Sequence, residues 1–174
     1  MSRYPTGLNK TVAEFERAML LHQQSSRETR VIGIFGLGGA GKTTLAKEIF
    51  NRRRSNYKKS CFLFDVRENA AKNTLKSLQT RILRDFGIKE NVQIDSTDEG
   101  IEKLKRYLKS SHAFLVLDDV DHLQQVEALL LPVKDVVGQG SLILVTSRNK
   151  DILTSSGIAE SSIFNVTGLD QDHS

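Results

Sequence analysis

The chain has 174 residues, of which 39% are hydrophobic and 26% are charged, and its formal net charge is +4. These values are typical of one globular domain with a single core, and they exclude a disordered or fibrous chain. The net charge is too small to indicate a nucleic-acid-binding surface. No stretch approaches the roughly 18 apolar residues of a membrane span. Since Cys61 is the one cysteine, an internal disulfide is excluded, and we expect a cytoplasmic protein.

The first predicted element is a helix that begins near Thr11. Thr11 and Glu14 have the spacing of a capping box, and Val12, Phe15 and Met19 recur on one face. A polar connection is expected over residues 23–29. The segment before residue 31 therefore reads as a lead-in with one helix.

From residue 31 onward, strand-like and helix-like patterns alternate. The expected strands are mostly continuous apolar runs, as in parallel sheets that are buried on both faces. They cover residues 31–35, 61–65, 113–117, 141–146 and 163–166.

The segments between these runs have helical spacing and helix-boundary residues. Leu75, Leu78 and Ile82 share one face and are followed by Gly87, a typical C-terminal cap. Other helices are predicted after residue 40, after the Ser96–Glu99 capping box, and after Asp121 as a cap. A long loop is expected over residues 89–98. The predicted fold is a doubly wound α/β domain with a mainly parallel five-stranded sheet and helices on both faces.

Residues 36–43 read GLGGAGKT and match the phosphate-loop pattern G-x-x-x-x-G-K-[ST] directly after a predicted strand. Gly36, Gly38, Gly39 and Gly41 allow the backbone to turn its N–H groups toward a pyrophosphate. Lys42 is expected to bind the β- and γ-phosphates and Thr43 to bind Mg²⁺. The alternative is a glycine-rich turn that binds nothing. The pattern favours a P-loop NTPase sheet with a nucleotide as ligand.

Two further strands end in side chains that suit this site. Asp118 follows an apolar run, as a Walker B aspartate that binds Mg²⁺ does, and Asp119 is a candidate base for an attacking water. Arg148 follows the next strand and is a candidate ligand of the γ-phosphate. The carboxyl ends of parallel strands meet at one edge, so these residues are expected together. The alternatives are a helix-capping Asp pair and a solvated surface arginine.

These blocks resemble the NB-ARC nucleotide-binding domain of plant disease-resistance proteins of the nucleotide-binding, leucine-rich-repeat class. The similar blocks are the phosphate loop through Ala40 and Thr44, and FLFDVRE at 62–68, FLVLDDVD at 114–121 and GSLILVTSR at 140–148. The block at 66–68 and Asp121 are similar to the branch with an N-terminal Toll/interleukin-1-receptor domain. The segment 4–8, with Gly7 and Leu8, is similar to the one that lies against adenine in this family.

The resemblance implies a switch that holds ADP at rest and ATP with Mg²⁺ after activation, followed by self-assembly. It divides the chain into a lead-in at residues 1–30 and a nucleotide-binding subdomain at residues 31–174. The sequence contains no counterpart of the family's helical and winged-helix subdomains. We therefore expect weaker nucleotide binding than in full-length relatives and no autonomous switching. A natural short form and a fragment of a longer chain both stay open.

Alternative functions are also open at this point. A small P-loop kinase would use Asp119 to activate a substrate hydroxyl, but it predicts an arginine-rich lid that the sequence does not display. A non-catalytic interaction module or decoy would keep the fold and associate with longer relatives. Nucleic acid is not an expected partner, because the basic run at 52–54 lies at a helix end. If the protein is an enzyme, we expect at most a slow ATPase.

Overall fold

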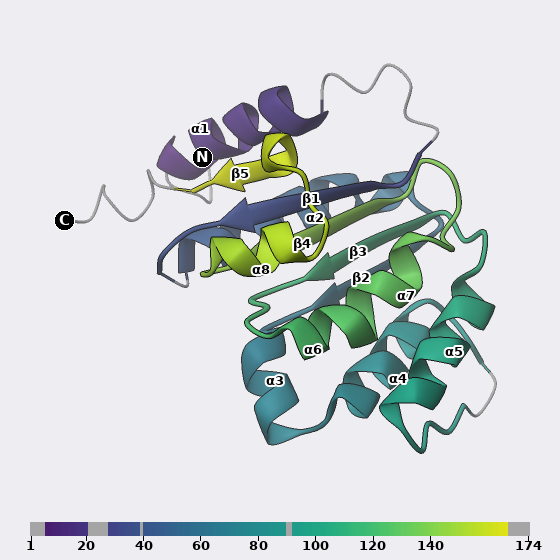
Figure 1. Cartoon of the computed structure of the whole chain (residues 1–174). Helices are drawn as coiled ribbons and strands as arrows, with labels where there is room; N and C mark the ends of the chain where they lie inside the picture. The colour runs from purple at the N-terminus through teal and green to yellow at the C-terminus, as the bar shows by residue number, and fades with distance from the viewer. Residues whose placement is uncertain (1–5, 21–27, 39, 90–91, 167–174) are drawn as a thin grey trace.

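The computed structural model describes residues 6–20, 28–38, 40–89 and 92–166. Five strands form one sheet in the order β2-β3-β4-β1-β5, and every neighbouring pair is parallel (Figure 1). Each strand end lies within two residues of its predicted position, which confirms the doubly wound α/β fold. The strands are β1 (Arg30–Phe35), β2 (Lys59–Leu63), β3 (Ala113–Leu117), β4 (Leu142–Ser147) and β5 (Ile163–Asn165).

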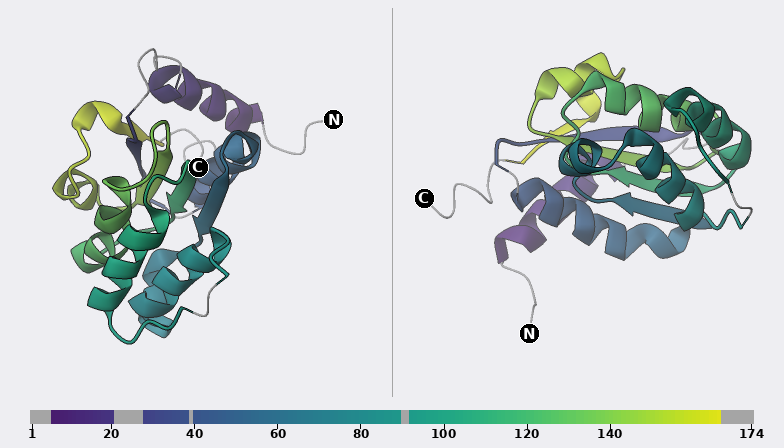
Figure 2. Two further views of the ribbon diagram at one scale, coloured as in Figure 1. Left: turned by 90° about the vertical axis from the view of Figure 1, so that its right-hand side faces the viewer. Right: turned by 90° about the horizontal axis from the view of Figure 1, so that it is seen from below.

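Helices cover both faces of the sheet. Figure 2 shows α1 and α2 on one side and α7 and α8 on the other. The helices on the first side are α1 (Thr6–Phe15), which continues as a π-helical turn (Glu16–Leu20), and α2 (Ala40–Arg53). The others are α3 (Val66–Lys72), α4 (Leu75–Asp85), α5 (Thr97–Leu108), α6 (Leu123–Gln125), α7 (Leu131–Lys134) and α8 (Lys150–Ser155), with a π-helical segment (Val126–Leu130) joining α6 to α7.

The core has two layers because successive side chains of a strand point to opposite faces. On β4, Leu142 and Leu144 pack with α1 and α2, whereas Ile143 and Val145 pack with the helices of the other face. All four side chains are at most 2% exposed. The central strands are therefore buried on both sides, as their continuous apolar runs predict.

Two predicted helix starts are wrong. The first helix begins at Thr6, and Thr11 lies inside it, where its hydroxyl donates to the Gly7 carbonyl at 2.8 Å. A threonine hydroxyl can bond the carbonyl four residues earlier, so a capping pattern also occurs within a helix. Asp121 is not the cap of α6, which is His122. The Asp121 carboxylate instead accepts from the Gln125 side-chain amide at 2.8 Å.

Other predicted boundaries are confirmed. Gly87 follows α4 with a φ of 82°, and its N–H donates to the Arg84 carbonyl. The Ser96 hydroxyl accepts from the Glu99 N–H at 3.1 Å at the start of α5. The predicted connections at 23–29 and 89–98 lie partly outside the described residues. Across the described ranges, no helix has the length and apolar character that a bilayer crossing requires.

Candidate functional site

The phosphate loop joins β1 to α2, the longest described helix, at 14 residues. Gly38 has a φ of 84°, which is the left-handed region that favours glycine. A Cβ atom at Gly36 would lie 3.0 Å from the Val166 carbonyl oxygen and 3.2 Å from Cγ of Lys42. Gly39 lies outside the described residues. Gly38 therefore needs glycine for its conformation and Gly36 for close packing.

Lys42 lies at the start of α2 and is only 2% exposed. Its ammonium group donates a hydrogen bond to the Gly38 carbonyl of the loop. The lysine charge is thus held against the loop backbone, where the pattern places the β- and γ-phosphates. The neighbouring Ala40 and Gly41 form the first turn of the same helix, whose positive dipole end favours an anion.

Asp118 follows β3 and joins several segments at the carboxyl edge of the sheet. Its carboxylate accepts from the Thr43 hydroxyl at 3.0 Å, the Thr146 hydroxyl at 3.0 Å and the Asp65 N–H at 3.1 Å. Burial raises the pKa of this carboxyl group, while these three hydrogen bonds lower it and the nearby Asp119 raises it further. A buried carboxylate beside a threonine hydroxyl is an oxygen-donor pair of the kind that Mg²⁺ prefers.

Asp119 is held in an unusual conformation next to Asp118. Its φ is 60°, its N–H donates to the Thr146 hydroxyl at 2.7 Å, and its carbonyl accepts from the Arg67 N–H at 2.9 Å. One carboxylate oxygen, Oδ2, accepts from Nε of Arg67 at 3.0 Å. The other, Oδ1, is 3.6 Å from Nε of Arg148 and has no hydrogen-bond partner within the described residues. Asp119 therefore lies between two arginines.

A hollow of about 360 Å³ connects these groups. Thr43 and Thr44 line it from α2, Asp118 and Asp119 from the end of β3, and Arg148 from the segment after β4, together with Lys47, Phe64, Asp65 and Arg67. A larger hollow of about 650 Å³ lies by α3 and α4 and contains no phosphate-loop residue. We regard the smaller one as the candidate site because it adjoins the phosphate loop.

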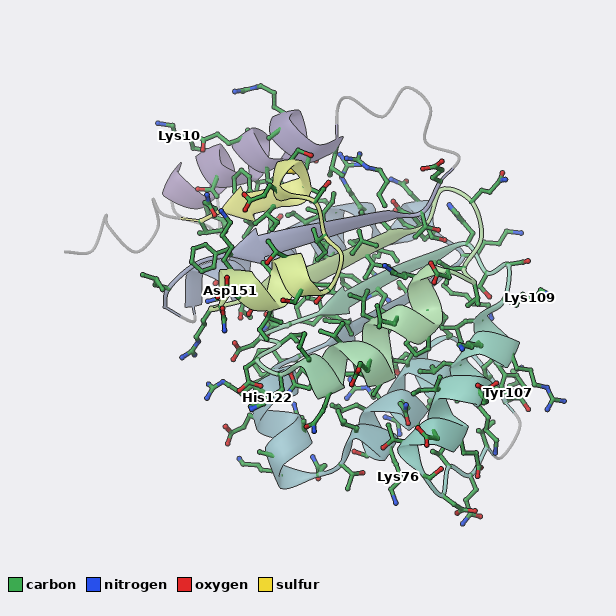
Figure 3. All side chains as sticks on the ribbon, viewed as in Figure 1. Lys10, Lys76, Tyr107, Lys109, His122 and Asp151 are labelled. Carbon is green, nitrogen blue, oxygen red and sulfur yellow. The ribbon has the colours of Figure 1, made fainter. Side chains whose placement is uncertain are left out.

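The segments that follow β3 and β4 reach the same edge of the sheet. Figure 3 labels His122, just before α6, and Asp151 in α8, and both lie toward the edge to which the strand arrows point. The first turn of α1, which contains Gly7 and Leu8, also lies toward this edge (Figure 1). The side chain of Leu8 is 1% exposed and packs in the core. Leu8 can therefore contact a ligand only through its backbone.

Sequence reasoning did not select three residues that contact the predicted site residues. Thr146 bonds both aspartates, Asp65 donates its N–H to Asp118, and Arg67 pairs with Asp119. A signal was present for Thr146, because it ends a buried strand in a hydroxyl at the same edge as Asp118. Asp65 and Arg67 were visible only as part of a longer block at the end of β2.

Comparisons with known proteins identify relatives that match most of the chain. The family model described as the NB-ARC domain matches residues 13–174. The chain is 37% identical over 155 residues to disease resistance protein RPV1 of Vitis rotundifolia, which covers 88% of this chain and 11% of that protein. It is 35% identical over 150 residues to TMV resistance protein N of Nicotiana glutinosa, covering 83% and 12%. The chain thus spans about one tenth of the length of these relatives.

Two chains from solved structures of DNA-bound complexes share the fold. A chain in the structure of Drosophila ORC bound to AT-rich DNA and Cdc6 aligns with a TM-score of 0.56 and 14% identity, covering 93% of this chain and 57% of that chain. A chain in the structure of Drosophila ORC bound to DNA aligns with a TM-score of 0.53 and 15% identity, covering 91% and 45%. At this identity the likeness concerns the fold alone.

Proposed function

Because the chain belongs to the NB-ARC domain family, we propose that it binds ADP and ATP with Mg²⁺ as the switch domain of a disease-resistance protein. The observation that carries this proposal is the contact between Thr43 of the phosphate loop and Asp118 at the end of β3, 3.0 Å apart. A full phosphate-loop pattern and an acidic strand end meet there across 75 residues of sequence.

The phosphate-loop pattern and the positions of the described side chains support the following roles. The loop glycines, Ala40 and Thr44 surround the phosphates with backbone N–H groups, and Lys42 binds the β- and γ-phosphates. Thr43 and Asp118 hold Mg²⁺, which screens phosphate charge when it is bound. Arg148, which lines the hollow from the segment after β4, binds the terminal phosphate. The backbone at Gly7 and Leu8 is proposed to contact the adenine.

Slow hydrolysis is part of the proposal. A general base needs a carboxylate oxygen that is open to accept a proton from water. Oδ2 of Asp119 already accepts from Arg67 at 3.0 Å, and Oδ1, which has no hydrogen-bond partner among the described residues, is buried 3.6 Å from Nε of Arg148. An aspartate held in this way favours retention of the nucleotide over its turnover.

Two parts of the proposal concern the context of the domain. We place it in the cytoplasm, in keeping with a single cysteine that is buried and reduced. We propose that it associates with itself or with longer resistance-type proteins. Residues 31–174 form the nucleotide-binding subdomain in this proposal, and residues 1–30 are its lead-in.

Thermal unfolding with and without ligand tests nucleotide binding. A ligand at 100 times its Kd stabilises the folded state by about 2.7 kcal/mol. For a domain of this size, that corresponds to a rise in Tm of about 5–10 °C. We expect this rise with ADP and Mg²⁺ and not with adenosine, which lacks the diphosphate. EDTA should remove most of the stabilisation by ATP.

A pair of lysine variants provides the control. Lys42→Ala should abolish the nucleotide-dependent rise, because it removes the charge at the phosphate loop. Lys109→Ala should leave it intact, since Lys109 lies on the other side of the molecule from His122 and Asp151 (Figure 3). The proposal fails if wild-type protein at millimolar ADP and Mg²⁺ melts at the same temperature as the ligand-free protein.

A further inference from the structure

Arg67 is fixed to the end of β3 by backbone as well as side-chain contacts. The N–H groups of Val66 and Arg67 donate to the carbonyls of Asp118 and Asp119 at 2.7 and 2.9 Å. Asp65, at a φ of 51°, caps α3 by accepting from the Glu68 N–H at 3.3 Å. The start of α3 is therefore attached to the two aspartates, and the position of the Arg67 side chain follows from that attachment.

Arg67 and Arg148 approach Asp119 from different segments of the chain. Both use Nε, at 3.0 Å for Arg67 and 3.6 Å for Arg148. The arginine side chains are 39% and 47% exposed, whereas that of Asp119 is 11% exposed. The carboxylate thus lies beneath two guanidinium groups that border the hollow, and their Nη groups have no hydrogen-bond partner among the described residues.

The charged groups that line this hollow balance in number, and the basic excess arises only around Asp119. The acidic groups are Asp65, Asp118 and Asp119, and the basic groups are Lys47, Arg67 and Arg148. Asp118 is assigned to Mg²⁺ in the proposed function, and Asp119 lies between two cations. Two arginines that share one carboxylate retain one positive charge in excess, on planar groups that suit phosphate oxygens.

We infer that Arg67 is a specificity-determining residue that acts with Arg148 to distinguish ATP from ADP. This inference rests on the proposed nucleotide function. Each guanidinium keeps its Nε toward Asp119 and directs an Nη group to the γ-phosphate, which ADP lacks. Asp119 is then a positioning residue, which holds the two arginines at the spacing that the terminal phosphate requires.

Selective binding provides the test. The affinities for Mg²⁺-ADP and for a non-hydrolysable ATP analogue with Mg²⁺ are measured by calorimetry for wild type and Arg67→Ala. Loss of a hydrogen bond to a charged group corresponds to about tenfold or more in affinity. We expect the affinity for the ATP analogue to fall by that factor and the affinity for ADP to change by less than about twofold.

Two further variants separate this role from a structural one. Lys72→Ala changes a cation on the same helix that pairs with Glu68 at 3.3 Å, and it should leave the ratio of the two affinities unchanged. If Arg67→Ala does not fold, Arg67→Gln is used in its place. It should lower the affinity for the ATP analogue relative to that for ADP. Equal weakening of both nucleotides, or no change in either, overturns the inference. Absence of binding by wild type instead overturns the proposed function.

Discussion

Replacing Thr146 by valine tests whether its hydroxyl holds the two aspartates in place. Thr146 is fully buried, and valine has nearly the same shape, so the change removes polarity without opening a cavity. It deletes a donor to Asp118 at 3.0 Å and an acceptor from the Asp119 N–H at 2.7 Å. Hydrophobicity alone predicts that valine is tolerated at this position.

The magnitude follows from the two lost hydrogen bonds. A hydrogen bond to a charged group contributes about 1.5–3 kcal/mol, and a buried N–H left without a partner costs about 1–3 kcal/mol. We expect Thr146→Val to lower the free energy of unfolding by about 3 kcal/mol, or the Tm by about 6–12 °C. Thr146→Ser keeps the hydroxyl and loses one buried methyl group, which costs about 1 kcal/mol.

The assay is urea and thermal unfolding of the three proteins without nucleotide. Thr154→Val is a surface control, since Thr154 is exposed on α8 and its hydroxyl contacts a carbonyl of its own helix. Its stability should change by less than about 0.5 kcal/mol. If Thr146→Val is as stable as Thr146→Ser or more stable, the hydrogen bonds do not have the importance assigned to them here.

Two other predictions concern the core beneath α4. A Cβ at Gly100 would lie 1.8 Å from Oε1 of Gln79, whose amide is fully buried and donates to two backbone carbonyls. Gly100→Ala should lower the free energy of unfolding in urea by about 2–4 kcal/mol. Adding Gln79→Ala to this variant should restore part of the lost stability. If the destabilising effects of the two substitutions simply add, the packing described here is contradicted. Burial, with the neighbouring Asp85 carboxylate, raises the pKa of the Cys61 thiol, so less thiolate is present at pH 8 than in an unfolded chain. An aromatic disulfide reagent should therefore react with Cys61 only in urea, and rapid reaction of the native protein would refute its burial.

Much of the sheet could be predicted because its strands are buried on both faces. An apolar run such as residues 113–117 predicts a buried strand without any other information, because all of its side chains are buried in one core layer or the other. The phosphate loop could be predicted for a similar reason. Its glycines, lysine and threonine are adjacent in sequence, so a single local pattern contains them.

The elements that were missed depend on contacts between distant residues. The seven-residue helix α3 has the sequence VRENAAK, in which Val66 is the one buried side chain. Its first N–H groups bond the carbonyls of Asp118 and Asp119, more than 50 residues further along the chain. No pattern within the segment reports such a partner. The pairing of Arg67 with Asp119 is hidden for the same reason.

Asp118 connects the ends of β2 and β4 and the phosphate-loop helix through a single carboxylate. Residue 65 contributes only its backbone N–H, whereas Thr43 and Thr146 contribute side-chain hydroxyls to the same acceptor. Substitution at residue 43 or 146 therefore removes one donor to Asp118, and whether it is tolerated depends on the residue at the other position. In a set of homologous sequences, these sites should vary together although they lie far apart in the chain.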